Sequence, residues 1–167
     1  MIIAADMHLN FKKIVINLFI FLCICFSSYV YATDYTISNG TTQTSRVTLT
    51  NNDTLTVDAG GEIDYTWPAV DADNRTFPAG TTTITNNGII EGNCCVIDIR
   101  SSTNPKLINN GTINGKSSSR TIYANNSVNA IIINNGDITI LEANDYEAID
   151  GDSSSGMTIT NNNGATI

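Results

Sequence analysis

Aliphatic residues recur along this chain in a fixed pattern, in which one aliphatic residue, five mostly polar residues and another aliphatic residue follow each other. Copies cover residues 49–55, 84–90, 107–113, 132–138 and, lengthened by two residues, 159–167. Apolar and polar side chains alternate within them, which is the period of a half-buried strand and not of a helix. Because the pattern returns after roughly 23–27 residues, it indicates a solenoid of stacked coils.

A third aliphatic position completes each coil. It lies ten residues before the pattern in three copies, as Ile97 does before Leu107. Three short strands per coil predict an all-β fold, a right-handed parallel β-helix that forms a three-sided solenoid. The predicted core positions are Ile84, Ile90, Ile97, Leu107, Ile113, Ile122, Ile132, Ile138, Ile149 and Ile159.

Asparagine and glycine fill the turn inside each copy. The predicted turn residues are Asn87, Gly88, Asn110, Gly111, Asn135 and Gly136. Asn and Gly adopt positive φ at low cost, which suits a tight turn. Stacked Asn side chains could instead form amide ladders from coil to coil. Both interpretations stay open at this point.

Three regions divide the chain. Residues 1–32 resemble a signal peptide with a signal helix, because Lys12 and Lys13 precede the apolar run 14–26, which is shorter than a membrane span of roughly 20 residues. We expect cleavage after Ala32. Residues 33–80 are expected to form an N-terminal cap and irregular first coils, and 81–167 the regular coils. The last strand stops at Ile167, so the chain looks truncated at its C-terminus.

Charge and composition exclude several functions. Loss of residues 1–32 removes Lys12, Lys13, Asp6 and the single histidine, His8, and changes the formal net charge from −8 to −9. Such an acidic surface repels nucleic acid and anionic membranes. Without histidine, Ser-His-Asp and Cys-His catalysis are not available. We expect no catalytic residue, cofactor or metal.

Repeats of the form T-I-T-N-N-G-I-I, L-I-N-N-G-T-I and I-I-I-N-N-G-D-I resemble autotransporter passenger domains, over residues 45–167. This resemblance implies the N-terminal fragment of an adhesin-like surface protein that is not an enzyme and contacts an extracellular protein or glycan. It also implies a β-barrel translocator downstream, and a location at the cell surface, in the outer membrane or in the medium. A chain that truly lacked a barrel would stay in the periplasm.

The contact residues are expected where insertions collect, in the loops 116–120 and 141–147. The candidates are Lys116, Ser117, Ser118, Ser119, Arg120, Glu142, Asp145 and Glu147. One alternative is a pectate-lyase-like β-helix that cleaves polysaccharide with Asp98, Arg100 and Asp150 on one outer face. Another is a purely structural spacer.

Cys94 and Cys95 depart from the passenger pattern, since passenger domains tend to lack cysteine. In an oxidising compartment they could form a strained adjacent disulfide. We favour the simpler interpretation, in which Cys95 is a small core residue and Cys94 its exposed neighbour. A zinc site lacks further ligands.

Overall fold

The computed structural model describes residues 32–117, 120–140 and 147–167, which belong to one compact unit, Ala32–Ile167. The other unit, Met1–Tyr31, contains nearly all of the predicted signal peptide, so the signal helix lies outside the described residues. The described residues form strands and turns without any helix. None of them therefore belongs to a helix that could cross a membrane.

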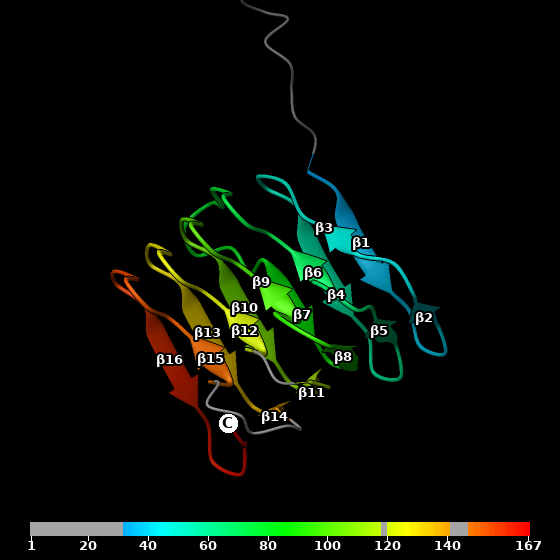
Figure 1. Cartoon of the computed structure of the whole chain (residues 1–167). Helices are drawn as coiled ribbons and strands as arrows, with labels where there is room; N and C mark the ends of the chain where they lie inside the picture. Colours follow the sequence, from blue (N-terminus) through cyan, green and yellow to red (C-terminus); the bar gives the residue numbers. More distant parts are fainter. Residues whose placement is uncertain (1–31, 118–119, 141–146) are drawn as a thin grey trace, which may run out of the picture. The chain divides into compact units, whose positions relative to one another are not determined.

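In the described part of the chain sixteen short strands form three parallel sheets, and the chain visits the sheets in the order A, B, C (Figure 1). Sheet A contains β1 (Asp34–Ile37), β4 (Thr54–Val57), β7 (Ile84–Asn86), β10 (Lys106–Asn109), β13 (Ile131–Asn134) and β16 (Thr158–Asn161). Sheet B contains β2 (Thr42–Gln43), β5 (Glu62–Asp64), β8 (Ile89–Gly92), β11 (Thr112–Gly115) and β14 (Asp137–Ile140). Sheet C contains β3 (Val47–Thr48), β6 (Val70–Asp71), β9 (Ile97–Asp98), β12 (Ile122–Tyr123) and β15 (Ile149–Asp150). This topology confirms the predicted three-sided parallel β-helix.

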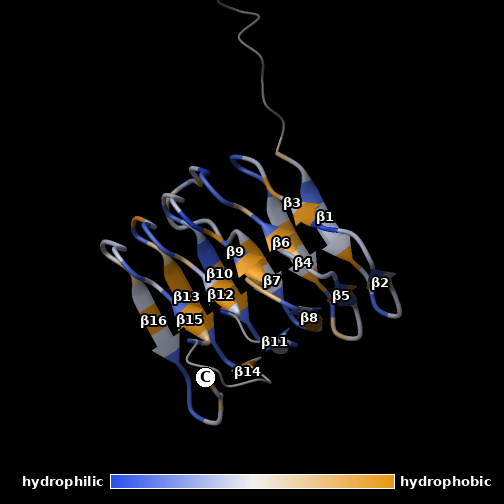
Figure 2. Cartoon of the chain, in the orientation of Figure 1, coloured by the Kyte–Doolittle hydropathy of each residue, from blue (hydrophilic) through white to orange (hydrophobic). Residues whose placement is uncertain are grey.

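The core consists of aliphatic columns that run through all three sheets. Each inward residue lies in register with the inward residue of the next coil, as Leu107 does with Ile84 and with Ile132. Alternation along each strand turns the polar neighbours outward (Figure 2). Eight predicted core residues are at most 1% exposed: Ile84, Ile90, Ile97, Leu107, Ile113, Ile122, Ile132 and Ile138. Burial of each stabilises the fold by about 1.5–3 kcal/mol.

Two predicted core residues are not enclosed. Ile159 pairs in register with Ile132 but is 47% exposed, and Ile149 is half-buried. Both belong to the outermost strand of their sheet among the described residues. The prediction that Ile159 is a core residue is therefore wrong for this structure, because no described coil covers the outer side of β16.

The Asn-rich turn joins sheets A and B, and its first asparagine points into the interior. Asn86, Asn109 and Asn134 are fully buried, and each amide nitrogen donates to the amide oxygen of the next coil at 2.8 Å, the last to Asn161. The same nitrogens donate to backbone carbonyls of the next coil, as Asn109 does to the Asp137 carbonyl at 3.1 Å. This inner Asn ladder satisfies groups whose burial would otherwise cost several kcal/mol.

A second ladder lies outside and runs in the opposite direction. The exposed amide of Asn110 donates back to Asn87 at 2.8 Å, and Asn135 donates back to Asn110 at 2.7 Å. Asn162 continues this outer Asn ladder by donating to Asn135. The structure thus decides between the two interpretations of the turn in favour of amide ladders.

The turn residues do not adopt positive φ, so that explanation of the Asn-Gly pairs is wrong at Asn87, Asn110 and Asn135. The glycines are needed for close stacking. A Cβ atom on Gly111 would lie 2.1 Å from the Gly88 carbonyl oxygen, and one on Gly136 would lie 2.1 Å from that of Gly111. Backbone atoms cannot move aside, so the stack excludes any side chain here.

Positive φ occurs instead at the corner between sheets C and A. Four stacked residues have φ between 52° and 58°: Asn74, Ser101, Asn126 and Ser153. Beside them Ser102 and Ser127 are fully buried, and their hydroxyls donate to carbonyls of the preceding coil, Ala72 and Ile99, at 2.5 and 2.6 Å. In the coils of Ser101, Asn126 and Ser153 this corner accompanies the ten-residue spacing before the next copy.

Residues 34–71, which were expected to form a cap and irregular coils, contribute strands in register to all three sheets. Leu55 pairs with Ile84, so the segment 49–55 is a corner between sheets C and A and not a copy of the Asn-rich turn. Asp53 closes this corner by accepting hydrogen bonds from the backbone N–H groups of Thr33 and Thr50, both at 2.7 Å. The predicted first copy is therefore wrong.

Candidate functional site

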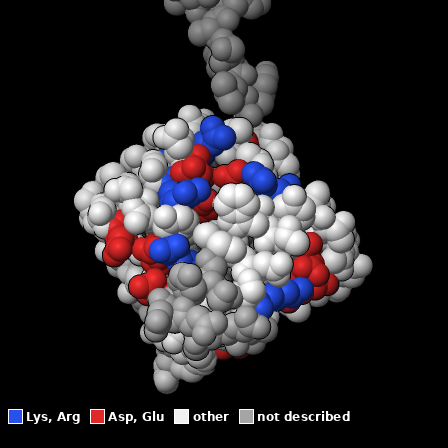
Figure 3. All heavy atoms as spheres, in the orientation of Figure 1, with Lys and Arg blue, Asp and Glu red and all other residues white. Residues whose placement is uncertain are grey.

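The outer face of sheet C carries ionisable side chains in register from coil to coil. Asp71 pairs with Asp98, Asp98 with Tyr123, and Tyr123 with Asp150. Outward positions on successive strands stack because the strand period is two and the sheet is parallel. Acidic and basic atoms consequently lie side by side on the face seen in Figure 3. We call Asp98, Arg100, Arg120, Tyr123 and Asp150 the sheet C array.

Asp98 and Arg100 form a two-point ion pair within one coil. The Nε atom of Arg100 lies 2.9 Å from Oδ1 of Asp98, and the second contact, from a terminal nitrogen to Oδ2, is 2.6 Å. Asp98 is 2% exposed, so this carboxylate is desolvated and held by the guanidinium. The hydrogen bond to Asp98 raises the pKa of Arg100 above its ordinary value. The pairing therefore stabilises the charged form of Arg100.

Tyr123 lies between two guanidinium groups. The central carbon of Arg100 is 4.6 Å from the ring centroid, and that of Arg120 is 4.9 Å from it. Both distances suit cation–π contact. Arg120 also forms an ion pair with Asp150, which is 5% exposed. Burial by itself lowers the pKa of Arg120, but Asp150 and Tyr123 raise it above its usual value.

The earlier coils extend the charged face. Arg46 contacts Asp71 at 3.1 Å, and Arg100 lies 3.7 Å from Asp73. Burial and the neighbouring Asp98 raise the pKa of Asp73. Arg46, Arg100 and Arg120 thus each have an acidic partner in their own or an adjacent coil.

The three residues of the polysaccharide-cleaving alternative do share this face, but they are already paired. Asp98 is held by Arg100, and Asp150 by Arg120. Tyr123 separates the two carboxylates in register, which places them about two rises, roughly 10 Å, apart. Paired catalytic carboxyls of glycosidases lie about 5–9.5 Å apart. Two rises lie at the upper limit of that range, and both carboxylates are held by arginines.

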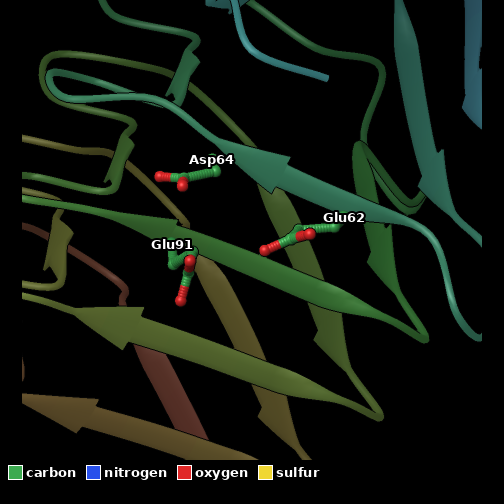
Figure 4. Close-up of side chains that lie close together, drawn as sticks. All are labelled: Glu62, Asp64 and Glu91. Atoms are coloured by element: carbon green, nitrogen blue, oxygen red, sulfur yellow. The ribbon is translucent and has the colours of Figure 1, made fainter. Parts of the chain in front are cut away.

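A second cluster, on the outer face of sheet B, was not predicted. One carboxylate oxygen from each of Glu62, Asp64 and Glu91 lies within 4.8 Å of the others (Figure 4). Glu62 and Asp64 flank an inward residue on β5, and Asp64 is in register with Glu91 on β8. Alternation within β5 was sufficient to predict that Glu62 and Asp64 point outward together. The proximity of Glu91 could be found only from the register between β5 and β8.

Lys116 supplies the positive charge of that cluster. Its Nζ atom is 3.0 Å from Asp64 and also contacts Glu91. The hydrogen bond to Glu91 raises the pKa of Lys116. Glu62 accepts a hydrogen bond from the Thr42 hydroxyl at 3.0 Å. Lys116 thus bridges two of the three carboxylates, Asp64 and Glu91, and the cluster keeps a net negative charge.

The predicted contact loops lie at the corner between sheets B and C. Ser118, Ser119, Glu142 and Asp145 fall outside the described residues. Lys116 and Arg120 both pair with carboxylates of the coil body, and Ser117 donates to the Asn93 carbonyl at 2.5 Å. Glu147 is exposed. The two cations of the first loop are thus directed toward the sheets.

No protein-family model, curated protein or solved structure gave a significant match to this chain. The fold and the two charged faces are therefore interpreted from their own geometry.

Proposed function

We propose that this chain is an exported, adhesin-like β-helix segment of the autotransporter passenger kind. In this proposal it contacts an extracellular protein or glycan through the sheet C array and the adjoining corner, without catalysis. The observation that carries the proposal is the position of Tyr123 between Arg100 and Arg120, on a face whose carboxylates are already paired.

Physical properties of this face support recognition. Tyrosine and arginine are the residue types that contribute most strongly to binding interfaces. The parallel ladders fix their spacing, so a partner would meet a surface that loses little conformational entropy on binding. The partly exposed guanidinium groups of Arg100 and Arg120 would select partners by charge as well as by shape.

Pairing of the acids also distinguishes this proposal from the enzyme alternative. A catalytic carboxyl must reach the bond that it cleaves, whereas a carboxylate bound at two points by a guanidinium has both of its oxygens already engaged. Asp98 has such a partner in Arg100. We therefore propose a binding role and not polysaccharide cleavage.

The test is binding of the purified full chain to a printed glycan array and to immobilised fibronectin and collagen. We expect at least one ligand, and a loss of affinity of about ten-fold or more for Tyr123→Ala, as for an interface hot spot. Arg46→Ala is the matched control, because it removes an ion pair of the same face three coils away. It should change affinity by less than about two-fold.

Two outcomes contradict the proposal. Absence of any ligand on all surfaces would favour the structural spacer. Release of unsaturated or reducing sugar ends that disappears with Asp98→Asn would favour the enzyme.

A further inference from the structure

Two adjacent cysteines lie at the corner between β8 and β9, away from the inner ladders. The Sγ atoms of Cys94 and Cys95 are 3.0 Å apart. A disulfide bond measures about 2.03–2.05 Å, so the two sulfurs need to approach by about 1 Å to form one. Cys95 is 5% exposed and Cys94 is half-buried, so one thiol is accessible and the other is shielded.

The backbone explains why both sulfurs lie on one side. Neighbouring side chains of an extended chain point to opposite faces. Cys95 instead has φ of 46°, in the left-handed region that residues with a Cβ rarely adopt. The other non-glycine residues with positive φ in the described part of the chain are Asn or Ser, whose polar side chains suit such positions.

Contacts to both neighbouring coils hold this conformation. The Cys95 N–H donates to the Arg120 carbonyl of the next coil at 2.7 Å. On the other side, the Val96 carbonyl accepts from the Val70 N–H of the preceding coil at 3.0 Å. The corner is therefore fixed by the same stacking that holds the sheets, and the approach of the two sulfurs is a property of the folded chain.

We propose that Cys94 and Cys95 are a site of reversible oxidation, at which a disulfide-bearing oxidant such as oxidised glutathione converts the two thiols into a vicinal disulfide. The thiolate of Cys94 attacks one sulfur of the oxidant, which releases one thiolate and leaves a mixed disulfide. The thiolate of Cys95 then attacks the Cys94 sulfur and releases the second half of the oxidant. The two cysteines lose two electrons and two protons, and the oxidant gains them as two thiols.

The surroundings favour both directions of this reaction. The guanidinium of Arg120 interacts with the Cys95 sulfur, and a nearby cation stabilises the thiolate that must attack. Adjacent Cα atoms are about 3.8 Å apart, closer than the roughly 4.4–6.8 Å of ordinary disulfides. Such a bond is strained and therefore readily reduced. The inference rests on this corner alone and is independent of the proposed binding function.

The test is redox titration of the full reduced chain against graded ratios of reduced and oxidised glutathione, followed by alkylation and tryptic mass spectrometry. Trypsin releases the fragment 76–100, which contains Cys94 and Cys95 and no other cysteine. We expect this fragment to change from the doubly alkylated form to a form about 2 Da lighter than the dithiol, and to return on reduction. Its oxidation equilibrium constant should exceed that of the isolated peptide 76–100 at least about ten-fold.

Variants separate this site from the other two cysteines. Cys94→Ser and Cys95→Ser should each abolish the lighter form, whereas Cys23→Ser combined with Cys25→Ser should retain it. The proposal is overturned if the fragment stays doubly alkylated at the most oxidising ratio, or if it is oxidised only through links to Cys23, Cys25 or a second chain. Equal oxidation equilibrium constants for the folded chain and the isolated peptide would also overturn the proposal.

Discussion

Replacement of Asn109 by aspartate tests the inner Asn ladder with almost no change of side-chain volume. The Asn109 amide nitrogen donates to Oδ1 of Asn134 at 2.8 Å and to the Asp137 carbonyl at 3.1 Å. A carboxylate cannot donate, so both buried acceptors lose their donor and face a negative oxygen instead. An orphaned buried polar group costs about 1–3 kcal/mol, and we therefore expect a total loss of about 3–5 kcal/mol at neutral pH.

Asn110→Asp is the matched control. It makes the same chemical change one residue along, in the outer ladder, where Asn110 is exposed and donates to Asn87 at 2.8 Å. Water replaces the lost partner, so the expected cost is below about 1 kcal/mol. Both variants add one negative charge, which cancels the contribution of overall self-repulsion.

The assay is urea unfolding followed by far-UV circular dichroism. With a slope of about 2 kcal/mol per molar urea, the inner variant should lower the midpoint by about 2 M and the outer variant by less than about 0.5 M. Burial should raise the pKa of the new carboxyl, so the loss should shrink as pH falls through that raised value and be smallest below about pH 4, because a protonated carboxyl can donate again. If the two midpoints agree within about 0.5 M, the buried amides do not contribute as we infer.

Three further changes test other parts of the fold. Gly111→Ala should cost about 3 kcal/mol or more in thermal unfolding, because its Cβ would lie 2.1 Å from the Gly88 carbonyl oxygen, and a loss below about 1 kcal/mol would contradict the close stack. Ile132→Ala should cost about 2–5 kcal/mol and Ile159→Ala, in the same column but 47% exposed, less than about 1 kcal/mol by urea titration. Burial by itself raises the pKa of Asp53, but hydrogen bonds from Thr33 and Thr50 outweigh it and lower the pKa. The stability that Asp53 adds over Asp53→Asn should therefore be complete above about pH 4 and lost as pH falls through the lowered value, whereas a difference that does not change with pH would refute this origin.

Much of the fold followed from the sequence because a solenoid repeats its pattern. Period-two alternation and the constant spacing between Ile97 and Leu107 were sufficient to predict three parallel sheets, which the pairing confirms. The early coils were harder to place. Val70 aligns with Ile97, so the leg from Val70 to Ile84 is longer than ten residues, and the position ten before Ile84 is Asn74, which is not aliphatic.

The prediction of positive φ in the Asn-Gly turn was wrong for a specific physical reason. Local propensity connects these residues with positive φ, but propensity says nothing of what lies one coil away. Gly111 is required by contact with Gly88, and Asn109 by contact with Asn134. Both contacts join residues more than twenty positions apart, so a reading of local sequence cannot distinguish them from ordinary turn chemistry.

The charged faces were predictable only in part for the same reason. The outward direction of Asp98 and Arg100 followed from alternation around Ile99, and the register then brought Tyr123 and Asp150 into line. The pairing of Arg120 with Asp150 did not follow, because Arg120 comes from a corner whose length differs in each coil. Variable corners change which side chains meet, while the regular strands do not.

Polar groups in the core determine register more strictly than the aliphatic columns do. A slip of β10 by one residue would turn Asn109 outward and place Ile108 inside, and a slip by two would set Leu107 against Asn86. The second slip retains apolar burial but leaves a buried amide without its partner, at a cost of several kcal/mol. The inner Asn ladder thus penalises alignments that aliphatic packing alone would tolerate. Since the outer residues are carried on the same strands, this interior register also sets the spacing of Tyr123 from Asp98 and Asp150, on which any recognition by sheet C would depend.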